Sequence, residues 1–260
     1  MLPALSTIRT GLEASQTQLD VISNNLANVD TTGFKRQRAL FQDLDYQTVQ
    51  QPGADSSTQT KLPIGLQLGT GVQVVGTQPI ETQGSLAQTG DSLDLAINGN
   101  GFFQVLQPNG TVSYTRDGSF QLNQNGQMVT ANGYLMQPPI TIPANATSIT
   151  VAQDGTVTVQ LPGQSAATQV GQIQLATFQN PAGLDRIGDN LLTQTGSSGA
   201  PNVQQPTING TGAVMQGYLE SSNVNVVNSM VDMITAQRAY QLGTDLANTA
   251  NQMLGYLANV

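Results

Sequence analysis

LPALSTIRTGLEASQTQLDVISNNLANV, residues 2–29, carries apolar side chains at alternating steps of three and four residues. Only Ser15 interrupts this series, whose members are Leu5, Ile8, Leu12, Leu19, Ile22, Leu26 and Val29. Such spacing is typical of the seam of a coiled coil. Pro3 stands in the first turn, where a helix tolerates proline. The pattern therefore predicts an amphipathic helix over Met1–Asn28.

The opposite end of the chain predicts a second amphipathic helix, over roughly Val226–Val260, with Asn223 and Asn225 as candidate caps. Its apolar stripe consists of Val227, Met230, Val231, Ile234, Leu242, Leu246, Ala250, Met253 and Leu257. Helices at opposite ends of a chain have few local partners to cover such stripes. We expect the two helices to pair as a coiled coil and other subunits to cover the remaining apolar surface. The alternative is that both helices dock on the chain's own middle part.

The composition restricts the chemistry that the chain can perform. Only 9% of its 260 residues are charged and its formal net charge is −8, which argues against a nucleic-acid partner. It contains no Cys, His or Trp. Disulfides, thiol catalysis, Cys/His metal sites and histidine-based acid–base catalysis are therefore excluded. We expect no cofactor and no metal.

The apolar runs are too short to cross a membrane, so we expect no stable membrane insertion. Arg9, Glu13 and Asp20 interrupt the N-terminal segment, which also lacks the basic region of a secretory signal peptide. A route out of the cytosol would therefore have to work without a cleaved signal peptide.

The first predicted helix ends in a polar turn. It fades over Asn24–Asn28, and Asp30–Gly33 has the residues of a turn that stops it. Lys35, Arg36 and Arg38 follow, and they are three of only eight basic residues in the chain. This basic cluster either contacts an acidic neighbour or lies in solvent.

A long polar segment, Tyr46–Leu68, precedes the β-type sequence. It contains Pro52 and Pro63, shows no sustained period and is too long for an ordinary connection. Either it is disordered, or it is an extended arm that other subunits order. The pattern alone leaves both possibilities open.

From about Val72 the chain predicts antiparallel β structure. Asn-Gly and Asp-Gly pairs supply the positive φ angles of tight hairpin turns. Four such pairs separate short strand-like runs: Asn109-Gly110, Asn125-Gly126, Asn132-Gly133 and Asp154-Gly155. We also expect strands at Ile173–Phe178 and Met215–Glu220, with a loop at Thr195–Pro206. The predicted fold class is α+β: paired terminal helices, an inserted, mainly antiparallel β domain and an extended polar arm.

One acidic stretch loosely resembles an oxygen-rich calcium loop. Its residues are Asp91, Asp94, Asn98 and Asn100-Gly101. Ala96, however, stands where a further ligand is needed. The alternative is a bend that the glycine allows.

A glycosidase would need only a pair of carboxylates, and the chain has sixteen. No local feature selects two of them, and few aromatic residues are available to stack on a sugar. Arg116-Asp117-Gly118 is expected to be a turn between strands. We therefore do not expect an enzyme, and an extracellular carbohydrate-active β protein remains the alternative from another functional class.

Several long motifs follow one another along the chain: SNNLANVDTTGFK (residues 23–35), NGNGFFQV (98–105), YTRDGSFQLNQNGQMVTANGY (114–134), GYLESSNVNVV (217–227) and MVDMITAQRAYQ (230–241). The first resembles the N-terminal signature of the bacterial flagellar rod and hook family. The next two resemble the hallmark of that family's β domain, and the last two resemble its C-terminal helix entry. Together these motifs span most of the chain.

The resemblance implies a structural subunit of the flagellar basal body. The arm at Tyr46–Val72 is similar to the insertion of distal rod subunits, whereas proximal rod subunits generally lack it and hook subunits are usually longer. A distal rod subunit is therefore implied, with another axial subunit of the proximal rod or hook as the alternative. By the same resemblance, the terminal helices would line a helical tube that transmits motor torque and serves as an export channel. The insertion would make this rod straight and stiff.

Partners and location are also implied by the resemblance. The chain would bind copies of itself in a helical homopolymer, as well as proximal rod subunits, hook subunits, ring bushing proteins, the rod cap and the flagellar export apparatus. It would be exported by the type III apparatus without a cleaved signal peptide and would assemble in the basal body across the periplasm.

We expect three parts in the chain: a discontinuous coiled-coil domain at residues 1–35 and 224–260, an arm and linker at 36–79, and a β-rich domain at 80–223. Residues expected at assembly interfaces lie on the helices, in the segment after the first helix, or in the arm. They are Leu5, Ile8, Leu12, Leu19, Ile22, Asn24, Asn25, Leu26, Asn28, Lys35, Arg36, Tyr46, Pro52, Leu62, Pro63, Val231, Ile234, Gln237, Arg238, Tyr240, Leu246, Met253 and Leu257. Arg238 lies among apolar positions, so it either reaches an acceptor on another helix or extends to water.

Overall fold

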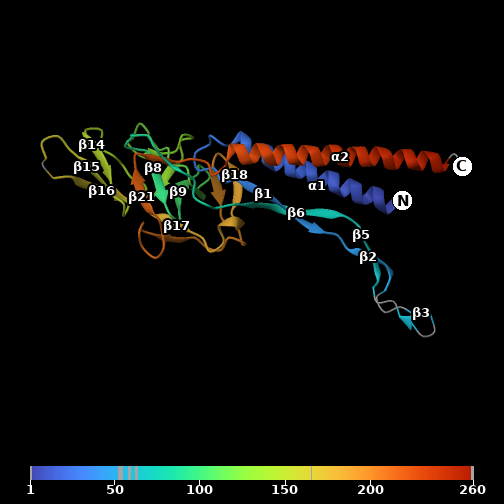
Figure 1. Ribbon diagram of the computed structural model, residues 1–260. Coiled ribbons are helices and arrows are strands. Elements are labelled where there is room, and N and C mark those ends of the chain that lie inside the picture. Colours follow the sequence, from blue (N-terminus) through green and yellow to red (C-terminus); the bar gives the residue numbers. More distant parts are fainter. Residues whose placement is uncertain (1, 52–54, 58–59, 62–63, 165, 259–260) are drawn as a thin grey trace. The chain divides into compact units, whose positions relative to one another are not determined.

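Two long helices, α1 (Leu2–Ala27) and α2 (Val226–Ala258), form near the two ends of the chain, as the apolar patterns predict (Figure 1). The structure is a computed structural model that describes residues 2–51, 55–57, 60–61, 64–164 and 166–258. The chain divides into two compact units. Residues 1–27, 37–78 and 225–260 form the helical unit, and residues 28–36 and 79–224 form the β unit.

Asn225 defines the start of α2. Its side-chain oxygen accepts a hydrogen bond from the backbone N–H of Asn228 at 3.0 Å, so it is the N-cap that the sequence predicts. The other candidate, Asn223, bonds elsewhere. Its side chain accepts from the N–H of Arg36 at 2.7 Å and donates to the carbonyl of Thr82 at 2.9 Å, which ties two segments of the β unit together.

The described part of the helical unit also contains three β ribbons. They pair β1 (Gln37–Asp43) with β6 (Val72–Pro79), β2 (Tyr46–Gln50) with β5 (Leu66–Gly69), and β3 (Asp55–Ser57) with β4 (Thr60–Lys61). β2 and β5 are antiparallel, with Tyr46 opposite Gly69. The described parts of the 46–68 arm therefore include extended β ribbons (Figure 1).

The β unit is built from short strands. They are β7 (Leu86–Gln88), β8 (Leu95–Asn98), β9 (Phe102–Leu106), β10 (Val112–Thr115), β11 (Gln121–Leu122), β12 (Met128–Val129), β13 (Leu135–Gln137), β14 (Ser148–Val151), β15 (Thr156–Gln160), β16 (Thr168–Gln172), β17 (Leu175–Thr177), β18 (Asp185–Gly188), β19 (Leu191–Thr193), β20 (Asn202–Gln204), β21 (Ala213–Gln216) and β22 (Tyr218–Glu220). A short 3-10 helix lies at Pro181–Gly183.

A nine-stranded sheet is the centre of this unit. Its main path is β11-β12-β13-β9-β10-β19-β18, and β17 joins β9 to β20. A second sheet has the order β14-β15-β16, and two further ribbons pair β21 with β8 and β22 with β7. The registered pairs in all these sheets are antiparallel, which confirms a mainly antiparallel β domain between two helices.

The four predicted hairpin turns are confirmed. Gly110, Gly126, Gly133 and Gly155 have φ angles between 74° and 84°. They join β9 to β10, β11 to β12, β12 to β13 and β14 to β15, and each of these strand pairs is antiparallel. These turns were predictable because their chemistry is local.

The C-terminal part of the β unit differs from the sequence-based expectation in detail. The strand expected at Met215–Glu220 is divided at Gly217, whose φ of 77° breaks the extended conformation. The two halves, β21 and β22, pair with different strands. The expected loop at Thr195–Pro206 contains a strand, β20, and the strand expected at Ile173–Phe178 is shorter. In the stretch that loosely resembles a calcium loop, Gly99 and Gly101 have φ angles of 117° and 138° and form a bend.

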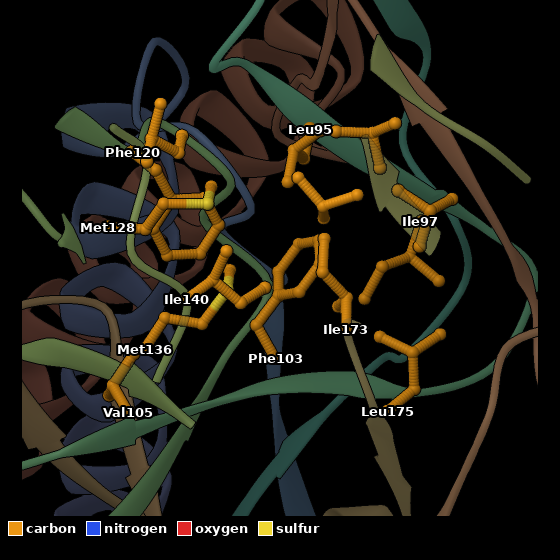
Figure 2. Packing of buried hydrophobic residues seen from close by; sticks show 14 of the residues in the cluster. Leu95, Ile97, Phe103, Val105, Phe120, Met128, Met136, Ile140, Ile173 and Leu175 are labelled. Atoms are coloured by element: carbon orange, nitrogen blue, oxygen red, sulfur yellow. The ribbon is translucent and has the colours of Figure 1, made fainter. Parts of the chain in front are cut away.

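Alternation along β9 separates two apolar clusters. Phe103 and Val105 point into the main core, where the rings of Phe103 and Phe120 pack edge to face at 5.3 Å between ring centroids (Figure 2). Phe102 points the other way and packs with Tyr114 and other side chains of a smaller cluster. Because successive side chains of a strand face opposite sides, one apolar strand serves both clusters.

Candidate assembly surfaces

The chain leaves one apolar face of α2 exposed. We call it the outer stripe, and its large side chains are Val227, Met230, Val231, Ile234, Leu242, Leu246, Met253 and Tyr256. Leu242 is 64% exposed and Tyr256 is 76% exposed. Large apolar side chains exposed together on one helix face mark a candidate interaction site. Most residues of the stripe predicted for the second helix therefore lie on this face.

The opposite face of α2 is covered and carries smaller side chains. We call it the inner stripe, and its members are Ser229, Met233, Ala236, Tyr240, Gly243, Ala247, Ala250 and Leu254, all buried or half-buried. α1 packs against α2, and a Cβ at Gly243 would lie 2.7 Å from the side chain of Leu12. The inner stripe alternates steps of four and three, which is the spacing of a helix–helix seam.

The predicted seam of α1 is covered within the helical unit. Ile22 is buried, and Leu5, Ile8, Leu12, Leu19 and Leu26 are half-buried. α1 contacts both α2 and β1, so two neighbours share this cover. Its exposed face is polar: Arg9 and Glu13 form a solvent-exposed ion pair at 3.4 Å.

The turn after α1 is fixed by one buried side chain. Asn25 donates from Nδ2 to the carbonyl of Gln37 at 2.7 Å, and its Oδ1 accepts from the N–H of Gln37 at 2.8 Å. These two bonds connect the end of α1 with the start of β1. Asn24 is exposed and Asn28 is half-buried, and both have interactions within the chain.

The other polar candidates differ in their surroundings. Lys35 is 4% exposed and has its acidic partner, Glu220, inside the β unit. Lys35, which the sequence places in a basic cluster with a possible acidic neighbour, is therefore paired with a carboxylate of its own chain. Arg36 is exposed, as are Gln237 and Arg238 on α2.

The arm exposes apolar side chains on both strands of its ribbon. They are Tyr46, Val49, Leu66 and Leu68, together with Ile64 in the adjoining segment, which is 79% exposed. The candidates Pro52, Leu62 and Pro63 lie outside the described residues, as does the side chain of Leu257.

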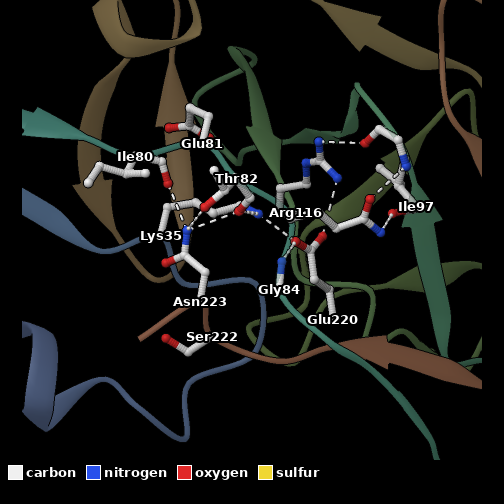
Figure 3. A network of polar contacts seen from close by, with 12 residues as sticks. Lys35, Ile80, Glu81, Thr82, Gly84, Ile97, Arg116, Glu220, Ser222 and Asn223 are labelled. Carbon is white, nitrogen blue, oxygen red and sulfur yellow. Dashed lines mark hydrogen bonds and ion pairs between the residues drawn. The ribbon is translucent and has the colours of Figure 1, made fainter. Parts of the chain in front are cut away.

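A buried cluster of charged side chains lies inside the β unit (Figure 3). Glu220 is 1% exposed and contacts two cations: its Oε1 pairs with Lys35 Nζ, and its Oε2 lies 3.2 Å from Arg116 Nη1. The N–H of Gly84 donates to Glu220 Oε1 at 2.9 Å. Lys35 Nζ also donates to the carbonyl of Thr82 at 2.9 Å. The carboxylate of Glu220 is therefore bonded on both oxygens.

Burial is the largest cause of the pKa shifts of four charged groups in and beside this cluster. It lowers the pKa of Lys35, and the attraction of Glu220 opposes the shift. It also lowers the pKa of Arg116 and Arg186 and raises the pKa of Glu81. Glu81 lies 3.8 Å from Arg186, which is still partly exposed. Charged groups that burial disfavours this strongly need their partners.

Sequence reasoning missed most of this cluster. It treated Arg116 as part of a turn and Glu220 as the end of a strand. The available signal was indirect: in a chain with so few charges, Lys35, Arg116 and Glu220 each fall inside one of the long family-like motifs. Their convergence was not predictable, because Lys35 and Glu220 are 185 positions apart.

Among the described residues, no group of three or more acidic side chains is placed to hold a metal ion. Likewise, neither helix, over the part that the structure describes, is long and apolar enough to span a membrane.

Three family descriptions match successive parts of the chain. Residues 5–35 match "Flagella basal body rod protein", residues 96–159 match "Flagellar hook protein FlgE/F/G D1 domain", and residues 215–260 match "Flagellar basal body rod FlgEFG protein C-terminal". The matched segments contain Lys35, Arg116 and Glu220.

Curated proteins are similar over the whole chain. The flagellar basal-body rod protein FlgG of Buchnera aphidicola subsp. Baizongia pistaciae is 52% identical over 258 residues, covering 99% of each chain. Its namesake in Caulobacter vibrioides is 48% identical, covering 97% of each. The FlgG protein of Bacillus subtilis is 38% identical, covering 100% of this chain and 99% of its own.

Proposed function

The chain belongs to the flagellar basal-body rod protein family and is a structural subunit of the flagellar rod, not an enzyme; on this premise we propose that its copies assemble into a helical tube. Repeated contacts between different surfaces, when they do not close into a ring, generate such filaments. The tube transmits motor torque and serves as an export channel, with the terminal helices in its inner layer.

The outer stripe of α2 is the observation that carries this proposal. Full burial of one large apolar side chain contributes about 1.5–3 kcal/mol, so covering eight partly exposed ones contributes on the order of 10 kcal/mol per subunit. The polar outer face of α1 offers no matching apolar surface. In the proposed tube, helices of neighbouring copies cover the outer stripe.

We further propose that α1 and α2 form a coiled coil. The seam of α1 and the inner stripe of α2 both alternate steps of three and four residues. Small residues such as Gly243 and Ala236 allow the helices to approach closely. The pair thus presents the outer stripe to other subunits. Arg238 and Gln237 are the polar contacts that this surface offers.

The arm stiffens the tube in this proposal. A two-stranded ribbon is at best marginally stable alone, and β2–β5 exposes Tyr46, Val49, Leu66 and Leu68. Contacts of these side chains with neighbouring subunits would lock the subunits together and keep the rod straight. Pro52, Leu62 and Pro63 belong to the same proposed contact. The arm is also the reason for placing the subunit in the distal rod.

The proposed partners of the subunit are other copies of the chain, proximal rod subunits, hook subunits, ring bushing proteins, the rod cap and the export apparatus. The subunit crosses into the periplasm through the flagellar type III apparatus, without a cleaved signal peptide. The alternative of another axial subunit has less support, because the relatives named FlgG align with this chain from end to end. Family membership sets aside the carbohydrate-active alternative.

Replacing Leu242 by Asp tests the role of the outer stripe. The exposed side chain leaves the fold of the monomer unchanged, whereas a buried charge at a subunit contact weakens that contact by roughly 10- to 100-fold. Motility and the number of rods in isolated basal bodies should fall. The matched control is Asn251→Asp, because Asn251 is exposed on the other side of α2. Equal effects of the two changes, or normal rods with Leu242→Asp, would contradict the proposal.

A further inference from the structure

Three distant segments of the β unit meet at Glu220. Lys35 precedes the whole of this unit's sheet structure, Arg116 follows β10, and Glu220 ends β22, the last strand. A backbone hydrogen bond adds to these contacts: the N–H of Gly33 donates to the carbonyl of Glu220 at 2.8 Å. Gly33 lies so close to Arg116 that a Cβ there would be 2.7 Å from the Arg116 carbonyl carbon. The segment after α1, which contains Gly33 and Lys35, is thus bonded directly to Glu220, which lies in the segment before α2.

Without Glu220, the two cations of this cluster would be buried together. Lys35 is 4% and Arg116 is 7% exposed, and their like charges disfavour each other. Among the described residues, their charged groups also contact the carbonyls of Thr82 and Gly99, and the Arg116 guanidinium carbon lies 5.3 Å from the centroid of the Phe102 ring. None of these groups carries a full charge. Glu81 attracts both cations, but its own ion pair is with Arg186. Removing one member of a buried ion pair is far more destabilising than replacing the whole pair by apolar groups.

We propose that Glu220 is a folding lock: the β unit closes over Lys35 and Arg116 only when β22 delivers the carboxylate between them. The lock goes beyond the proposed assembly, since it acts within one subunit. Earlier parts of the β unit, including β9 and β10, remain open until the chain through residue 220 is in place. A subunit therefore acquires its stable β unit in one step, after its C-terminal part has joined.

Equilibrium unfolding of full-length variants tests the charge requirement. Glu220→Gln keeps the size and an acceptor oxygen but removes the charge, so the unfolding equilibrium constant of the β unit should rise at least about 100-fold. The matched control, Glu81→Gln, makes the same change in the same cluster and should raise it less than about 10-fold. A Glu220→Gln variant as stable as the unchanged protein would overturn the lock.

A third variant covers the case in which Glu220→Gln does not fold at all. Lys35→Met and Arg116→Met, added to Glu220→Gln, remove the charges that the lock must neutralise. This triple variant should fold again, as judged by protease resistance of the β unit. Failure of the triple variant to recover any stability would mean that the charges are not the cause, and the proposal would be wrong.

The order of events has its own test in the unchanged full-length chain. During refolding, pulsed hydrogen exchange measures when backbone amides become protected. The amides of Gly33 and Gly84, which donate to Glu220, should gain protection in the same kinetic phase as those of β9 and β10. Protection of β9 and β10 in an earlier, separate phase would show that the sheet closes without the lock.

Discussion

Gly243 of α2 faces Leu12 of α1 so closely that a Cβ on the glycine would lie 2.7 Å from Leu12 Cδ2 and 3.3 Å from Leu12 Cγ. Gly255, in the same helix, has no such neighbour: a Cβ there would meet open space among the described atoms. A mid-helix glycine reduces helix stability by about 1 kcal/mol relative to alanine. Close packing against α1 therefore explains why residue 243 is a glycine, but it does not explain the glycine at 255.

Gly243→Val should weaken the pairing of α1 with α2. Overpacking of this kind costs about 1–3 kcal/mol, because Leu12 must move away. The control Gly255→Val should be neutral or slightly stabilising, since valine has the better helix propensity and no clash. Thermal unfolding followed by helical circular dichroism measures both. Equal melting temperatures for the two variants would contradict the close approach.

Asn25 should be essential for the turn at the end of α1. Asn25→Ala removes both bonds to the backbone of Gln37, and the loss of a buried hydrogen-bonded pair costs about 1–3 kcal/mol. The backbone amide of Gln37 loses its acceptor in this variant, so its native-state hydrogen exchange should become faster. Ser23→Ala, at an exposed position in the same turn of helix, is the control and should leave that amide unchanged.

The two faces of α2 differ in how visible they are in the sequence. Periodicity of large apolar residues predicted both helices and, on α2, selected mainly the outer stripe. The inner stripe escaped notice because Ser229, Ala236, Gly243 and Ala247 are small and add little hydrophobicity. Small residues at a seam become recognisable only when the partner helix is in place. The face that packs within the chain was thus the less visible of the two.

The β unit shows the same contrast between local and distant information. Its hairpins were predictable, because a turn such as Asn109-Gly110 and its flanking strands are neighbours in sequence. The division of the last strand at Gly217 depends on pairing with β8 and β7, more than 100 residues earlier. The ion cluster around Glu220 likewise depends on three distant segments. No short pattern encodes such contacts.

Glu81 should make stability depend on pH in a defined direction. Burial raises its pKa above the ordinary value of 4.5, so the folded chain binds more protons than the unfolded chain just above that pH. The contribution of Glu81 to stability is therefore present below pH 4.5 and is lost as the pH rises through the folded-state pKa. Other carboxylates also titrate there, so the comparison must be with Glu81→Gln.

The stability of the unchanged protein minus that of Glu81→Gln should fall as the pH is raised from about 4 to 7. Urea unfolding midpoints of both proteins across this range give the difference. A difference that rises with pH would mean that the attraction of Arg186 outweighs burial.

Deleting Tyr46–Leu68 should give rods that curve. In the proposed tube, the ribbon β2–β5 holds neighbouring subunits in fixed register, and the deletion removes its exposed apolar side chains together with its backbone. Electron microscopy of isolated basal bodies measures curvature. A finer variant pair isolates the side chains: Leu66→Ser with Leu68→Ser should soften the rod, whereas Gln67→Ser between them should not. Straight rods of unchanged length after the deletion would contradict this role of the arm. The stiffness would then come from the contacts between helices of neighbouring subunits.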